Sequence, residues 1–113
     1  MTTSGAASRR KGADFERAIA AHLRRVNIPS TRTSNGRRQD DGDLTNTLGL
    51  HIECKNQQRL DLAGWMAQAR ADAGHGRVPV LIVKRRNVAH AGRQWAVLEL
   101  GDLLHLLGVT DDA

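Results

Sequence analysis

The sequence Leu50-His51-Ile52-Glu53-Cys54-Lys55 decides the fold. A short run of this composition is typical of a β-strand, in which successive side chains point to opposite faces of a sheet. The side chains expected to point into the core are those of Leu50, Ile52 and Cys54. Glu53 and Lys55 are then neighbours on the other face, where they form a rigid pair of a carboxylate and an ammonium group.

A second carboxylate, Asp43, comes ten residues before Glu53. Together they offer hard oxygen ligands of the kind that bind Mg²⁺ and leave coordination positions to water. One interpretation of the pattern is a magnesium-dependent nuclease site. The other is an ordinary solvated strand face, because Glu-x-Lys often occurs by chance. Asp40 and Asp41 are rivals to Asp43, which we prefer because Leu44 marks the entry into an apolar strand.

The charge balance indicates a polyanionic partner. The 113 residues include 17 Lys and Arg against 12 Asp and Glu, a formal net charge of +5. Nucleic acid is the commonest partner of so basic a protein. No apolar run approaches the roughly 18 residues of a membrane span, and the polar N-terminus has no signal-peptide core. With a single cysteine, Cys54, an internal disulfide is excluded, so we expect a cytoplasmic, DNA-binding protein without membrane contact.

The N-terminal part predicts an arm followed by a helix. Residues 1–11 are polar and then basic, so we expect a flexible basic arm. Residues 12–26 carry apolar side chains at helical spacing, and Pro29 ends this helix. Residues 12–113 are expected to form one domain, because a chain of this length has one small core.

Residues 30–107 contain patterns typical of strands and of helices. The expected elements are strands at 30–34, 43–45 and 50–55, a helix from Asp61 to Gly74, strands at 78–84 and 95–100, and a helix at 103–107. The helix from Asp61 is long enough for a right-handed crossover between parallel strands. An α/β sandwich around a mixed central sheet is predicted, with an αβββαβ core followed by a further strand and a short helix.

This order of motifs resembles the PD-(D/E)XK nuclease superfamily, and within it the small Holliday-junction resolvases of archaea and phages. Lys11-Gly12-Ala13-Asp14-Phe15-Glu16 resembles their first-helix motif, and Ser34-Asn35-Gly36 resembles their Ser/Gly-containing loop. Gly42-Asp43-Leu44 takes the place of their Pro-Asp, and Glu53-Cys54-Lys55 is the E-x-K motif. The resemblance covers nearly the whole chain and implies a restriction-endonuclease-like fold.

The resemblance also implies hydrolysis of DNA phosphodiester bonds with Mg²⁺, for which Mn²⁺ is expected to substitute. Asp43, Glu53 and the backbone carbonyl of Cys54 are expected to hold the ion. Lys55 would orient or deprotonate the attacking water and stabilise the developing charge. Glu16 is expected to bind a second ion or its water shell, and a solvated helix position is the alternative for it.

Basic clusters flank the predicted metal site, and cations in such places suit phosphate contacts that position DNA without reading its sequence. A solvated basic surface is the alternative for any one cluster. The resemblance adds a serine of the loop as a contact to the scissile phosphate. The expected DNA-binding residues are Arg9, Arg10, Lys11, Ser34, Arg37, Arg38, Lys84, Arg85 and Arg86.

We therefore predict a structure-selective endonuclease that resolves four-way DNA junctions as a homodimer. One small chain carries one active site, and a two-fold dimer supplies the two cuts that a junction needs. The alternatives are another nuclease of the superfamily, such as a nicking repair or restriction-type enzyme, and a non-catalytic basic DNA-binding module. Trp65 and Trp95 are interpreted as core residues, one of them a candidate for the dimer interface. The five histidines lack the spacing of a zinc site.

Overall fold

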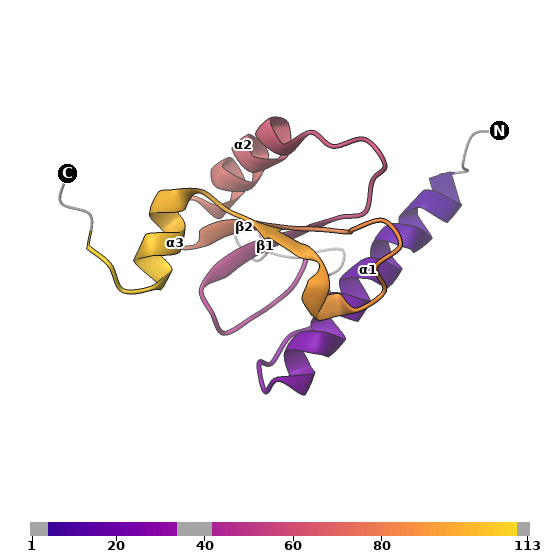
Figure 1. Cartoon of the computed structure of the whole chain (residues 1–113), viewed down its shortest axis with the longest axis horizontal. Helices are drawn as coiled ribbons and strands as arrows, with labels where there is room; N and C mark the ends of the chain where they lie inside the picture. Colours follow the sequence, from indigo (N-terminus) through magenta and orange to yellow (C-terminus); the bar gives the residue numbers. More distant parts are fainter. Residues whose placement is uncertain (1–4, 34–41, 111–113) are drawn as a thin grey trace.

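A computed structural model of the chain describes residues 5–33 and 42–110, which form a mixed sheet with helices on both faces (Figure 1). This architecture confirms the predicted α/β class. The elements in chain order are α1 (Gly5–Arg25), β1 (Leu50–Lys55), α2 (Leu62–Ala73), β2 (Val78–Val83), the 3₁₀ helix η2 (Ala91–Arg93), β3 (Trp95–Val97) and α3 (Leu100–Leu106).

The sheet has the order β1-β2-β3, with β2 in the centre. β1 and β2 are parallel and place Glu53 beside Leu81, whereas β2 and β3 are antiparallel and place Val83 beside Trp95. A parallel pair needs a crossover connection, which α2 provides, as the sequence predicted. The predicted strand at 50–55 is confirmed at both ends by β1.

α1 packs on one face of the sheet. Phe15, Ile19 and Ala20 of α1 form a buried cluster with Leu44 and Ile52. Phe15 and Ile19 are four residues apart, about one helical turn, and Ala20 follows Ile19 directly, so the three face the sheet from one side of α1. Burial of each large apolar side chain stabilises the fold by about 1.5–3 kcal/mol, and this cluster fixes α1 against β1.

α2 packs on the opposite face of the sheet (Figure 1). Ala69 of α2 is buried with Leu81 and Val83 of β2, and Trp65 and Met66 pack against them while partly buried. This face is the one that Glu53 shares, because Glu53 and Leu81 are paired in the sheet. The helix therefore covers the side of β1 that carries the predicted catalytic pair.

The ends of α2 are those that the sequence predicted. The Asp61 carboxylate accepts a hydrogen bond from the Gly64 N–H at 3.0 Å, which satisfies a free donor of the first turn. Gly74 follows the last turn with a positive φ of 62°, and its N–H donates to the Arg70 carbonyl. Leu62, the first residue of α2, is exposed although it is apolar.

α1 begins at Gly5, so residues 5–11 are helical and the helix starts seven residues before residue 12, where the sequence placed its start. Residues 1–4 of the predicted flexible arm lie outside the described residues. Alanine, arginine and lysine are strong helix formers and extend the helix beyond its packed part. The apolar periodicity reports only where a helix packs, and it therefore placed the start at residue 12. At the other end, Asn27 has a left-handed φ of 68° two residues before Pro29, which confirms the predicted end.

The short strands predicted at 30–34 and 43–45 are not formed in the residues described, 30–33 and 43–45. In the described segments, Arg32 forms an isolated antiparallel bridge with Leu44, and Gly42 forms a parallel bridge with Ile52. These described segments form no regular hairpin, since the bridge between Gly42 and Ile52 is parallel. In the connection between them, the Asn46 side chain bonds the Leu50 backbone at both N–H and C=O.

The C-terminal elements also differ from the prediction. β3 ends at Val97 and α3 begins at Leu100, instead of a strand to residue 100 and a helix from residue 103. Asp102 lies in the first turn of α3 and forms an ion pair with Arg70 of α2. Within the ranges that the structure describes, no helix is long and apolar enough to cross a membrane.

Candidate active site

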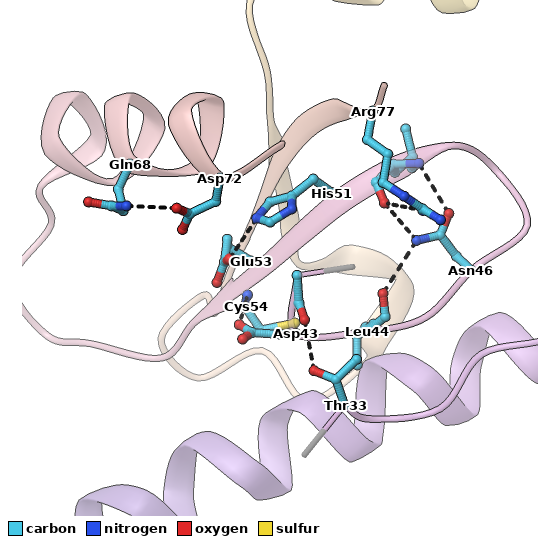
Figure 2. Close-up of polar contacts among 12 residues, drawn as sticks. Thr33, Asp43, Leu44, Asn46, His51, Glu53, Cys54, Gln68, Asp72 and Arg77 are labelled. Atoms are coloured by element: carbon cyan, nitrogen blue, oxygen red, sulfur yellow. Dashed lines mark hydrogen bonds and ion pairs between the residues drawn. The ribbon is translucent and has the colours of Figure 1, made fainter. Parts of the chain in front are cut away.

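Asp43 is fixed beside β1. Only 9% of this residue is exposed, and its Oδ2 accepts a hydrogen bond from the Cys54 N–H at 2.8 Å. The Asp43 N–H donates to the Ile52 carbonyl at 2.7 Å, and its carbonyl accepts from the Thr33 N–H. The carboxylate therefore lies against the middle residue of the Glu-x-Lys motif, as Figure 2 shows.

Gly42 makes this close approach feasible. Its φ is +68°, and a Cβ atom on it would lie 2.5 Å from the Ile52 carbonyl oxygen and 2.9 Å from the Ile52 nitrogen. An L-residue is disfavoured at this φ, and a proline, with φ near −65°, cannot adopt it. Gly42 stands where the superfamily has a proline. Its conformation and small size allow this chain to place Asp43 against β1.

Glu53 points toward α2, where it meets two residues that the sequence analysis missed (Figure 2). His51 is completely buried, and its Nε2 lies 2.8 Å from Glu53 Oε1. Ligand atoms of His51, Glu53 and Asp72 lie within 4.8 Å of one another, a spacing suited to a divalent cation. Asp72 accepts a hydrogen bond from Gln68 at 2.9 Å.

All four predicted catalytic side chains affect the pKa of the Cys54 thiol. Burial raises its pKa well above the usual range, and the negative charges of Asp43, Glu16 and Glu53 raise it further, while Lys55 lowers it. These four groups therefore lie within electrostatic range of Cys54. With so high a pKa the thiol stays protonated and is no nucleophile.

Glu16 and Lys55 are each held by a neighbour. Arg32 Nε donates to Glu16 Oε1 at 2.6 Å, and the Glu16 side chain is mostly buried. The solvated helix position considered for Glu16 is therefore not observed. Lys55 Nζ lies 5.4 Å from the centroid of the Trp65 ring, a cation–π distance. The role of Glu16 toward a second ion stays a prediction.

The donors around this end of β1 fit a hard divalent cation. Asp43, Glu53 and Glu16 offer carboxylate oxygens, and Cys54, whose N–H binds Asp43, lies between the two motif residues. Carboxylate and carbonyl oxygens are the ligands that Mg²⁺ and Mn²⁺ prefer. Among the described residues, the ligand atoms that lie within 4.8 Å of one another are those of His51, Glu53 and Asp72, and neither Asp43 nor Glu16 belongs to this group. An ion held beside the Lys55 ammonium group would supply the charge distribution that phosphodiester hydrolysis needs.

Two of the three predicted basic clusters meet beside this site. Lys11 and residues 84–86 line one cavity of about 570 Å³, together with residues 56–58, which follow directly after β1. Arg9 and Arg10 are exposed on α1, in the turns before Lys11. The predicted DNA contacts that lie outside the described residues are Ser34, Arg37 and Arg38, and the rival carboxylates Asp40 and Asp41 lie outside them as well.

Comparison with known proteins gives a family. The model of a family described as "Phage putative PDDEXK endonuclease" matches residues 7–98 of the chain. The matched span contains every predicted metal ligand and Lys55. Neither the curated proteins nor the solved structures give a significant match.

Proposed function

The chain belongs to the phage PDDEXK endonuclease family, and from this premise we propose a Mg²⁺-dependent DNA endonuclease that nicks branched DNA as a homodimer. Family membership makes the protein a nuclease of the PD-(D/E)XK superfamily, with DNA as the substrate. The observation that carries the proposal is the hydrogen bond from the Cys54 N–H to Asp43, which joins the two halves of the motif.

The proposed mechanism assigns a role to each group at the end of β1. Asp43, Glu53 and the Cys54 carbonyl would hold the ion. When bound, a divalent ion supplies positive charge for the phosphate oxygens and lowers the pKa of a bound water. Lys55, oriented by its contact with the Trp65 ring, positions the attacking water and stabilises the charge that develops on the phosphate.

Charge around the site supports binding of DNA phosphates. Lys11 and residues 84–86 place cations along one cavity, and Arg9 and Arg10 continue the basic surface along α1. Contacts of this kind neutralise phosphates irrespective of sequence and position the strand over the metal ligands. Selection of a branched substrate is then a matter of shape and not of base sequence.

The homodimer has its support in the apolar surface of the C-terminal segment. Trp65, one of the two interface candidates, packs together with Met66 against the core under α2. The large apolar side chains left exposed on α3 and just after it are Leu100, Leu103, Leu106, Leu107 and Val109. A second copy of the chain would cover them and place two sites about a two-fold axis, as cleavage of a four-way junction requires.

The proposal is tested by cleavage of a labelled four-way junction, a flap, a linear duplex and a single strand with Mg²⁺, Mn²⁺ or a chelator. Asp43→Asn, Glu53→Gln and Lys55→Ala are expected to abolish metal-dependent cleavage, because each removes a charge that the mechanism needs. DNA binding and the circular dichroism melting curve should stay close to those of the native protein.

The matched control is Glu99→Gln, which makes the same chemical change at an exposed carboxylate paired with Arg70. This variant should cleave normally. Near-normal cleavage by Glu53→Gln would contradict the assignment of the site. Binding of every DNA without cleavage of any, by the native protein with Mg²⁺ or Mn²⁺, would instead favour the non-catalytic DNA-binding module.

A further inference from the structure

An exposed tryptophan stands in the basic cavity beside the candidate active site, and the mechanism above does not use it. Trp95 of β3 is 56% exposed, so the expectation that it belongs to the core is wrong. Its ring lines the same cavity as Lys11 and residues 84–86. A large aromatic surface open to water in a positively charged hollow is a feature that binding sites for nucleic acid bases share.

The Trp95 ring is fixed by contacts with the loop between β2 and β3. Trp95 pairs with Val83 in the sheet, and the Arg85 guanidinium carbon lies 5.2 Å from the centroid of its ring. Arg85 is anchored in turn, because its Nη1 donates to the Arg93 carbonyl and its backbone N–H donates to Gln94 Oε1. The platform is therefore formed before any ligand arrives, which lowers the entropic cost of binding.

The wall of the cavity combines three kinds of group. Besides Trp95 and the cations, the side chains of Asn56, Gln57 and Gln58 line it, and no carboxylate does so among the described residues. Amide side chains match the donor and acceptor edges of bases, and the cations match phosphates. A volume of about 570 Å³ lies in the range of small-molecule sites.

The position of the cavity selects which part of a DNA strand reaches it. Asn56 follows Lys55 directly, so the cavity opens next to the residues proposed to act on the scissile phosphate. A base inside a duplex is stacked on both faces and paired, and it cannot lie on the Trp95 ring. An unpaired base has a free face, and stacking on tryptophan accepts any base.

We propose that this cavity binds one unpaired nucleotide of the DNA substrate, with the base stacked on Trp95 and the flanking phosphates bound by Lys11, Arg85 and Arg86. The inference rests on the proposed nuclease function and deepens it. It identifies the substrate class as DNA with unpaired bases at or beside the scissile bond. Selection of branched DNA then has a local cause in addition to the symmetry of a dimer.

The first test follows the fluorescence of Trp95 in the presence of a chelator, so that no cleavage occurs. Trp65→Phe leaves Trp95 as the one tryptophan of the chain. We expect quenching by oligo(dT) and by a duplex that carries a two-nucleotide bulge, and much weaker quenching by a blunt duplex of equal length. Equal quenching by the blunt duplex would overturn the proposal.

The second test compares affinities by fluorescence anisotropy of labelled DNA. Trp95→Ala is expected to weaken binding of the bulged duplex about fivefold to a hundredfold and to leave the blunt duplex within about twofold, because the variant removes only the stacking surface. Trp95→Phe should keep most of the affinity. Val26→Ala, which truncates another exposed apolar side chain at the far end of α1, is the matched control and should change neither.

These experiments distinguish an error in the proposed nucleotide pocket from an error in the proposed nuclease function. Trp95→Ala that binds both duplexes as the native protein does, with cleavage intact, overturns the pocket and leaves the nuclease standing. Selective quenching by unpaired DNA together with no cleavage under any metal supports the pocket and overturns the nuclease. If Trp95→Ala does not fold, the fluorescence test and Trp95→Phe decide.

Discussion

His51 is a residue whose place in the site the sequence hardly indicated. Its imidazole is fully buried, and its Nε2 lies 2.8 Å from Glu53 Oε1. A histidine that bonds a metal-binding carboxylate fixes the orientation of that carboxylate before the ion arrives. We expect His51 to act as a positioning residue for Glu53.

Replacement of His51 by leucine should therefore raise the metal concentration needed for half-maximal cleavage about tenfold to a hundredfold, because Glu53 loses its contact with the imidazole. His51→Gln carries an amide that can replace the Nε2 contact and should restore part of the affinity for the ion. The measurement is a Mg²⁺ titration of cleavage rate beside a thermal melt. An unchanged metal requirement in a folded His51→Leu protein would show a purely structural role.

At this scale the sequence predicted the residues whose positions follow from strand alternation and spacing. Glu53 and Lys55 flank the residue whose N–H binds Asp43. The place of Asp72 in the site could not be predicted from the sequence, because Asp72 comes close to Glu53 through the packing of α2 on the sheet. Trp95 was misplaced because apolarity predicts burial but does not tell whether another element covers the residue.

At the scale of elements, the junction between Gly42 and β1 depends on a conformation and a space that glycine alone provides. Gly42→Ala should destabilise the protein by about 1–3 kcal/mol or more and impair cleavage, since its Cβ would meet the Ile52 backbone at 2.5 Å and displace Asp43. Chemical denaturation and the cleavage assay measure the two effects.

Gly49→Ala is the matched control for this prediction. Gly49 also has a positive φ, of 73°, but nothing lies within 4 Å of a Cβ atom built on it. The strain there should cost only about 1–2 kcal/mol and leave cleavage largely intact. Equal loss of activity in both variants would show that general destabilisation, and not the position of Asp43, is responsible.

Element prediction succeeded where a segment carries its own signal. β1, the cap at Asp61 and the end of α2 follow from alternation, capping chemistry and glycine. In the described parts of the chain, the segments around residues 32 and 44 are joined by a single bridge, and their conformation depends on partners far away in the sequence. Local patterns do not contain that information, so a strand was predicted at 43–45, ahead of the connection in which the Asn46 side chain bonds the Leu50 backbone.

For the whole molecule, the arrangement of charge predicts how binding responds to salt. Arg9→Ala with Arg10→Ala should weaken binding to all DNA sequences and lower the slope of log affinity against log salt by about 0.9 for each phosphate that the protein no longer neutralises. Arg25→Ala is the control, because Arg25 lies about 24 Å from Arg9 along α1. An unchanged slope in the double variant would show that these arginines do not touch the DNA backbone.

The exposed leucines of α3 predict that the protein forms a dimer. Leu100 is 70% and Leu107 is 68% exposed, at the two ends of α3. If a second subunit covers them, the native protein is a dimer at micromolar concentration in light scattering, and Leu100→Glu with Leu107→Glu gives a monomer, because burial of the new charges is prohibitive.

The cleavage products of the native protein and of the monomeric variant distinguish a dimeric resolvase from a general nuclease. On a plasmid with an extruded cruciform, a dimer cuts two opposing strands within one complex and gives linear DNA, whereas the monomeric variant should give nicked circles first. Val26→Glu charges another exposed apolar position, at the end of α1, and should leave both mass and product unchanged. A native protein that is monomeric and cuts junction and duplex equally well would contradict junction resolution, yet it would leave the Asp43, Glu53 and Lys55 site intact, because one subunit contains all three.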